Sequence, residues 1–177
     1  MKGPPLATWV KRITDLIKVH AEQWCRYPLV RAYQAFRGGS FVVAVTVAAE
    51  IGDMNRFQNP KQLMAYLGLI PSEHSSGKSI RRGSITKTGN GHVRRVLVEA
   101  AWTYHMPARV STILQKRQQG LSKSICDLFW KAQTRLCARF HRLIARGKSR
   151  QSVVTAIARE LSAFIWAIDK EVKEFAV

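Results

Sequence analysis

Acidic residues are scarce in this sequence. Its 177 residues include 11 Asp and Glu against 29 Lys and Arg, which gives a formal net charge of +18. A charge of this size destabilises a compact chain by self-repulsion unless a polyanion offsets it. Nucleic acid is therefore the expected partner, although an anionic membrane surface or a ribosome would satisfy the same balance. We find no pair of carboxylates suited to general acid–base or two-metal chemistry.

Long apolar runs and paired cysteines are also missing. No segment approaches the roughly 20 apolar residues that span a bilayer, and the first residues do not have the pattern of a signal peptide, so we expect no membrane partner. The cysteines Cys25, Cys126 and Cys137 form no CxxC pair and are predicted to be reduced, buried thiols of a cytosolic protein. The five histidines show no metal-ligand spacing, so we expect no metal and no cofactor within this chain.

One stretch, residues 68–90, combines glycines, hydroxyls and cations in the sequence GLIPSEHSSGKSIRRGSITKTGN. No acidic residue occurs between Glu73 and Glu99. Such a segment is unsuited to a core, whereas glycine lets backbone amides approach an anion and basic side chains favour phosphate. We predict a phosphate-binding loop that presents a nucleophilic serine; the alternative is an ordinary solvated loop.

The tripeptide Gly-Lys-Ser at residues 77–79 resembles the end of a nucleotide-binding P-loop. That motif requires a glycine five residues before the second one, and Ser72 occupies the position here. The preceding sequence, LMAYLGLIP, is typical of a helix followed by a turn rather than of a buried strand. Nucleotide hydrolysis is therefore excluded.

Ser76 is the candidate nucleophile of this loop, and Ser75 is the neighbouring alternative. A serine hydroxyl is a poor nucleophile unless it is activated. Gly77 allows close backbone approach, and nearby cations can neutralise a phosphate under attack. His74 is a candidate base, but adjacency within a loop does not set hydrogen-bond geometry.

The rest of the chain predicts an all-α fold. An amphipathic helix is expected over residues 6–27, stopped by Tyr27-Pro28, and such a helix normally packs on its own domain. The apolar run from Phe41 to Ile51 is interpreted as a buried helix that ends at Gly52, and Asn59 is expected to cap the next helix. Further helices are predicted over residues 91–106, 124–145 with Ser124 as the cap, and 151–175.

Two of these helices flank a glycine turn in the sequence LVRAYQAFRGGSFVVAVTVAAEIGD, residues 29–53. The arrangement is similar to a helix-hairpin-helix, in which turn amides and a helix N-terminus hold phosphate. The usual turn is Gly-hydrophobic-Gly, whereas this one is Gly38-Gly39-Ser40. A purely structural hairpin is the alternative.

Basic residues recur at helical spacing from Lys131 to Arg146, with no acid on that helix after Asp127. This pattern favours a nucleic-acid track over a merely solvated face. Arg94 and Arg95 open another helix, where positive charge opposes the helix dipole. The predicted nucleic-acid-binding residues are Lys78, Arg81, Arg82, Lys87, Arg94, Arg95, Lys131, Arg135, Arg139, Arg142 and Arg146.

The stretch at 68–90, followed by RRVLVEAAW, resembles the C-terminal transposase domain of bridge-RNA-guided recombinases of bacterial insertion sequences, a family related to the pilin-gene invertases. The segments AEIGDMNRFQNPKQLMAYLGL, WKAQTRLCARF and GKSRQSVVTAIARELSAFIW also fit its pattern. The resemblance covers roughly residues 28–168 and predicts a helix at 1–27 that ends a subunit-pairing linker, then a transposase domain at 28–177. It implies DNA transposition in the bacterial nucleoid, with Ser76 as the strand-exchange nucleophile.

The resemblance also implies partners. Family members carry an N-terminal, resolvase-like domain with four metal-binding acids, which has no counterpart here, so magnesium is expected only with that domain, supplied in cis or in trans. DNA, a guide RNA and further copies of the chain are the other implied partners. The rival hypotheses are a non-catalytic nucleic-acid-binding regulator from a decayed mobile element and a basic protein that binds ribosomal RNA.

Overall fold

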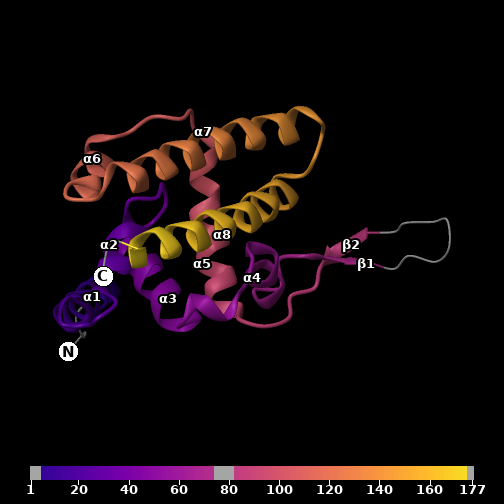
Figure 1. Cartoon of the computed structure of the whole chain (residues 1–177). Coiled ribbons are helices and arrows are strands. Elements are labelled where there is room, and N and C mark those ends of the chain that lie inside the picture. The colour runs from indigo at the N-terminus through magenta and orange to yellow at the C-terminus, as the bar shows by residue number, and fades with distance from the viewer. Residues whose placement is uncertain (1–4, 74–81, 175–177) are drawn as a thin grey trace.

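The computed structural model describes residues 5–73 and 82–174, and Figure 1 shows their arrangement. The helices are α1 (Leu6–Glu22), α2 (Tyr27–Gln34), α3 (Phe41–Ile51), η1 (Met54–Arg56), α4 (Pro60–Tyr66), α5 (Gly91–Ala101), η2 (Trp102–His105), α6 (Thr112–Gln118), α7 (Lys123–Ala145) and α8 (Arg150–Glu174). The all-α class is confirmed, with one addition. Strands β1 (Pro71–Glu73) and β2 (Arg82–Ile85) form an antiparallel pair that leaves the helical body.

Helix α8 organises the core, packing against α2, α4, α5 and α7 (Figure 1). Its buried stripe consists of Val153, Ile157, Leu161, Ile165 and Ile168. Burying each such side chain contributes about 1.5–3 kcal/mol. The Tyr33 hydroxyl of α2 donates a hydrogen bond to Asp169 Oδ1 at 3.3 Å, and the Trp166 indole donates to the Phe57 carbonyl at 3.0 Å. These bonds fix the position of α8 against its neighbours.

Most predicted helix boundaries agree with the structure because capping side chains mark them. Asn59 caps α4 and accepts from the Gln62 amide at 3.2 Å, and the apolar run at 41–51 is helix α3, as expected. The predicted cap of α7 is wrong by two residues. Ser122, rather than Ser124, accepts from the amide of Ile125. Helix α6 was not predicted.

The helix expected over residues 6–27 is shorter than predicted, and a second helix begins at its predicted end. Helix α1 ends at Glu22, and Pro28 lies in the first turn of α2 instead of stopping a helix. Proline suits a first turn because the amide hydrogen that it lacks has no helical acceptor there. The prediction that α1 packs on its own domain is largely wrong too. Ala21 is the one buried side chain of α1, while Leu6 is 79% exposed and Leu16 is 62% exposed.

The glycine turn between α2 and α3 is packed against protein. Gly38 has a φ of +78°, and a Cβ there would lie 2.6 Å from the Ala100 carbonyl oxygen of α5. Arg117 donates hydrogen bonds to the carbonyls of Gln34 and Gly39. These contacts favour the structural hairpin, and phosphate binding by this turn stays a prediction.

The thiols are not uniformly buried as predicted. Cys137 is buried, Cys126 is half-buried and Cys25 is exposed. Burial raises the pKa of Cys137, and Arg37 partly opposes that shift. In the part of the chain that the structure describes, no helix combines the length and apolar character needed to cross a membrane.

Candidate nucleic-acid interface

The predicted nucleophile belongs to the connection between β1 and β2. Ser76, with Ser75, Lys78 and Arg81, lies outside the described residues. Pro71 pairs with Ile85 and Glu73 with Arg82, and a register irregularity separates the two pairs. Only the backbone of Arg82 is described. The two ends of the segment predicted as a loop are therefore the paired strands of a short hairpin.

Two glycines shape the base of this hairpin, where α4 ends and α5 begins. Gly68 has a φ of +62°, and a Cβ there would collide with the backbone of Thr88. Gly89 has a φ of +69°, and a Cβ there would collide with the Tyr66 carbonyl. Only glycine accepts both the left-handed backbone and the close contact without strain. The glycines of this stretch thus bring the two ends of the hairpin together.

Arg94 holds the same junction from α5. Its Nη1 donates to the Leu67 carbonyl at 2.9 Å and to the Thr88 carbonyl at 3.0 Å. One guanidinium nitrogen therefore bridges the chain before the hairpin and the chain after it. Arg94 was predicted as a phosphate contact, and the structure gives it a role in positioning the hairpin. Its neighbour Arg95 is exposed and forms an ion pair with Glu99 at 3.1 Å.

Glu50 links the end of α3 to the start of α5. Its carboxylate accepts from Asn90 Nδ2 at 2.9 Å and lies 3.1 Å from His92 Nδ1. These hydrogen bonds lower the pKa of Glu50, with Asn90 contributing most. Asn90 also caps α5 by accepting from the amide of Val93. Because the hairpin returns to the body at Asn90, this network fixes its second end.

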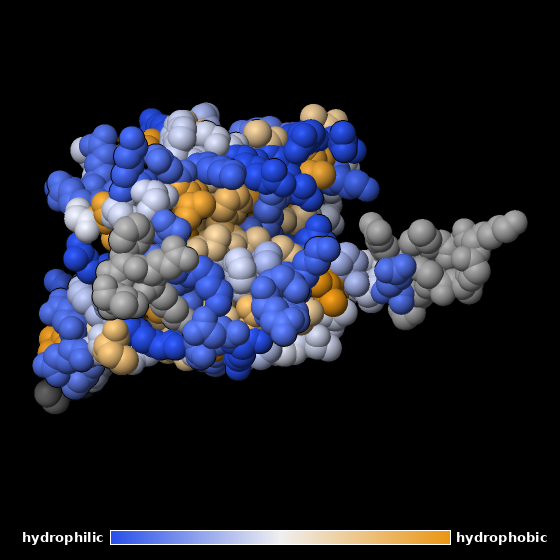
Figure 2. Space-filling view, in the orientation of Figure 1, coloured by the Kyte–Doolittle hydropathy of each residue, from blue (hydrophilic) through white to orange (hydrophobic). Residues whose placement is uncertain are grey.

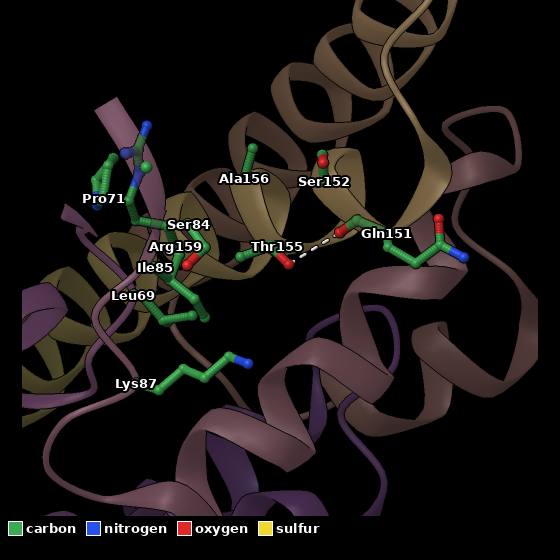
Figure 3. A pocket seen from close by; sticks show the side chains of 11 residues that line it. Leu69, Pro71, Ser84, Ile85, Lys87, Gln151, Ser152, Thr155, Ala156 and Arg159 are labelled. Carbon is green, nitrogen blue, oxygen red and sulfur yellow. Dashed lines mark hydrogen bonds between the residues drawn. The ribbon is translucent and has the colours of Figure 1, made fainter. Parts of the chain in front are cut away.

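Lys87 follows β2 and has a backbone φ of +57°, the one positive φ outside glycine among the described residues. A left-handed backbone costs a residue with a Cβ roughly 1–2 kcal/mol. Its amide donates to the Gly68 carbonyl at 3.1 Å, which holds the strained conformation. Its side chain lines a cavity beside α8 (Figure 3).

The predicted basic stripe on α7 receives an acidic partner from α8. Glu160 pairs with the guanidinium groups of both Arg135 and Arg139; the Arg139 Nε to Glu160 Oε2 distance is 3.1 Å. The sequence of α7 alone, which lacks acids at these positions, could not reveal this. Across residues 5–73 and 82–174, no ion pair to an acid involves the other stripe residues, Lys131, Arg142 and Arg146.

Three residues of the stripe, Lys131, Arg135 and Arg139, line one side of a groove of about 680 Å³ between α4, α7 and α8. Its apolar lining includes Met64, Leu128, Ala163, Phe164 and Ala167. Figure 2 shows hydrophobic side chains gathered beside the hydrophilic band along α7. The predicted track is therefore a cationic edge next to an apolar hollow, rather than a flat charged face.

Sequence reasoning missed the contribution of α8 to this surface. Gln151, Thr155 and Arg159 are spaced by four residues on one helix face and all line the cavity beside Lys87. That spacing is readable from sequence, but only the packing of α8 beside the hairpin connects it with Lys87. Arg159 lines both this cavity and the groove along α7.

Magnesium has no suitable site in the described part of the chain. No group of three or more His, Cys, Asp or Glu side chains there could hold a metal ion. Glu50 and Glu160, two acids beside the candidate surface, accept from or pair with neighbouring side chains.

Known proteins provide an independent comparison. Residues 31–114 match the family model described as Transposase IS116/IS110/IS902 family. The chain therefore contains a transposase domain of the IS110/IS116 family. A Sinorhizobium fredii protein, y4qE, which is named as a transposase, is 46% identical over 162 residues, covering 92% of this chain and 42% of that protein.

Two further relatives carry informative names. The transposase for insertion sequence element IS1111A of Coxiella burnetii is 37% identical over 68 residues, which is 38% of this chain and 19% of the relative. The pilin gene-inverting protein of Moraxella lacunata is 28% identical over 126 residues, which is 71% of this chain and 32% of the relative. The chain thus spans less than half the length of each of these relatives.

Proposed function

We propose that this chain binds DNA and supplies the serine nucleophile of a DNA transposase or site-specific recombinase. The observation that carries the proposal is the 46% identity to a protein named as a transposase, which extends over 92% of the chain. The names of the relatives include both transposition and gene inversion, two processes that cut and rejoin DNA. The net charge of +18 supports a polyanionic partner.

The chemistry assigned to Ser76 is phosphoryl transfer. The serine hydroxyl loses its proton as its oxygen forms a bond to the DNA phosphorus, one bridging P–O bond breaks, and the released DNA oxygen takes up a proton, so that no net proton is gained or lost. Attack by another DNA hydroxyl on the serine phosphodiester reverses these events and joins a new strand. Lys78, Arg81 and Arg82 would neutralise the attacked phosphate. The two hydrogen bonds from Arg94 to the carbonyls of Leu67 and Thr88 support this assignment, because they fix where the hairpin leaves the helical body.

DNA is held, in this proposal, along the cationic edge of α7 and by Lys87 and Arg95 beside the hairpin. The absence of acidic partners for Lys131, Arg142 and Arg146 among the described residues leaves these cations available to phosphate. Arg135 and Arg139 contribute less free charge because they share Glu160.

The proposed activity requires partners beyond this chain. The greater length of the relatives is consistent with an additional acidic, resolvase-like domain, in cis or in trans, which would bind magnesium. A guide RNA would select the DNA. The exposed apolar face of α1 supports pairing between copies of the chain.

The test is a search for a covalent protein–DNA adduct. The chain, reconstituted with the acidic domain of a relative, is incubated with a nicked DNA substrate that traps the cleaved strand, and denaturing electrophoresis detects the adduct. Ser76→Ala should abolish it, because no other atom can form the serine–phosphate bond. DNA affinity should change little, since one neutral hydroxyl contributes about 1 kcal/mol or less to a many-phosphate interface.

Ser75→Ala is the matched control and should retain the adduct. An adduct that persists in Ser76→Ala but disappears in Ser75→Ala would move the nucleophile one residue upstream. An adduct unaffected by both substitutions would end the serine hypothesis. DNA binding with no adduct in any combination would favour the non-catalytic nucleic-acid-binding module.

A further inference from the structure

A cavity of about 380 Å³ lies where the hairpin meets the first turns of α8. Figure 3 shows its lining side chains, which come from β2, the segment after it and α8. The volume is within the roughly 300–1,000 Å³ range of small-ligand sites. It is too small for a nucleic-acid helix but matches one planar group with attached polar substituents.

The lining separates into an apolar wall and a polar rim. Pro71, Ile85 and Ala156 are half-buried and provide the apolar surface, and the buried Leu69 completes the lining on this side. The rim consists of Ser84, Lys87, Gln151, Ser152, Thr155 and Arg159. No acidic residue occurs among these described lining residues. The cavity thus combines a surface for an apolar ring, hydrogen-bonding groups and two cations.

Lys87 gives this lining its clearest sign of functional constraint. Its left-handed backbone would be relaxed by glycine, yet the position holds a long cation. Strained backbone of this kind clusters at ligand-binding sites. In Figure 3 the Lys87 side chain extends along one side of the cavity, opposite Thr155 on α8. The lysine amine is therefore available to an anionic group on a bound molecule.

The α8 side offers directional hydrogen bonds. Thr155 Oγ1 donates to the Gln151 carbonyl at 2.9 Å, which orients the hydroxyl and leaves its lone pairs as acceptors. Gln151 is exposed at the rim, and its amide carries both donors and an acceptor. Such a pair of groups can read the edge of a nucleobase.

The geometry points to a pocket for one unpaired DNA nucleotide, its base against the apolar wall and its phosphate near Lys87. This inference rests on the proposed function, because the pocket lies beside the hairpin whose connecting segment contains Ser76, the proposed nucleophile. An unpaired base costs least to remove from a stack, which makes such a pocket a reader of locally opened DNA. The cationic rim distinguishes this ligand from an uncharged apolar molecule.

The experiment compares binding of two DNA duplexes that differ by a single unpaired adenine. The full chain should bind the bulged duplex about fivefold more tightly than the paired one. This factor is at the low end of the range for a contact with a single base, because the wall of the pocket is aliphatic rather than aromatic. Ala156→Leu fills the half-buried wall and should abolish this preference while leaving affinity for the paired duplex unchanged. Ala145→Leu, an exposed alanine at the end of α7, is the control that should retain the preference.

A second variant keeps the inference testable if Ala156→Leu does not fold. Lys87→Gly removes the cation while relieving the left-handed strain, so it should fold and should reduce the preference for the bulge. Salt-dependent binding without any preference, or a preference unchanged in both variants, would overturn the pocket but leave the proposed function standing. Failure to bind either duplex would overturn the proposed function.

Replacing the bulged strand by RNA identifies the source of the nucleotide. We expect the DNA version to show the larger preference. A preference seen only with RNA would support the nucleotide pocket but overturn its assignment to DNA.

Discussion

Arg94 shows how a basic residue in a basic protein can have a structural role. In the sequence it is one cation among 29 Lys and Arg. In the fold it bridges the carbonyls of Leu67 and Thr88, on the two sides of the hairpin. Charge counting therefore overestimates the number of cations available to phosphate, because carbonyl groups also recruit guanidinium groups.

Glu50 leads to a prediction about pH. Hydrogen bonds from Asn90 and His92 lower its pKa in the folded chain below the ordinary value of 4.5. The unfolded chain therefore binds a proton first as pH falls, so the stabilisation is present above pH 4.5 and is lost below it. Glu50→Gln removes this contribution and should be less stable than the wild type at pH 7.

Urea unfolding at pH 7 and at pH 3 measures the effect. The two proteins should differ in midpoint at pH 7, and the difference should shrink as the pH falls and the wild-type carboxylate becomes protonated. A difference that persists undiminished at pH 3 would assign the loss to the geometry of the Asn90 cap rather than to the carboxylate charge.

At the scale of elements, α7 and α8 divide the basic stripe into two groups. Glu160 of α8 neutralises charge at Arg135 and Arg139, while Lys131, Arg142 and Arg146 have no ion pair to an acid in the described part of the chain. Helix periodicity predicts which residues share a face. It does not predict what the neighbouring helix places opposite them.

This division predicts unequal effects on DNA affinity. If about six phosphates are neutralised, the slope of log affinity against log salt on duplex DNA should be roughly −5. Replacing Lys131, Arg142 and Arg146 by glutamine should flatten the slope by about 2–3 units. Replacing Arg135 and Arg139 should flatten it by about 1 unit or less, because the two guanidinium groups share Glu160 and together present about one net positive charge to phosphate.

Fluorescence anisotropy titrations at several salt concentrations measure these slopes. Lys123→Gln, which removes a positive charge from an exposed residue at the start of α7 outside the stripe, controls for the loss of net charge. An unchanged slope in the triple variant would mean that the stripe is only solvated.

For the whole molecule, α1 determines the expected assembly. Its apolar residues Trp9, Ile13 and Leu16 are 49%, 54% and 62% exposed. An apolar face of this kind on one chain is typical of an interaction surface. We expect copies of the chain to associate through α1, and the double substitution Ile13→Glu and Leu16→Glu should shift the population to monomer.

Sedimentation velocity over a range of protein concentrations tests this. Lys11→Glu changes the net charge by the same two units on the polar face of α1 and should leave the association intact. A wild-type chain that stays monomeric at every concentration would remove the oligomer from the proposal.

The sequence by itself determined the helical class and most helix boundaries of this protein, because local signals carry them. Apolar residues at helical spacing predicted α5, α7 and α8, and Asn59 marked the start of α4. Local signals failed where one residue is compatible with two structures. A proline can stop a helix or lie in the first turn of one, and Pro28 lies in the first turn of α2. Net charge and the stretch at 68–90 also pointed to nucleic acid before any fold was known.

Tertiary structure alone decided which of these residues act together. Lys87 and Thr155 are separated by 68 positions and line one cavity only because α8 packs beside the base of the hairpin. Glu160 reaches Arg135 from another helix, and Arg94 reaches the carbonyls of residues up to 27 positions away. Periodicity describes one element at a time, whereas these contacts depend on how elements pack, which is set by the sum of many buried side chains.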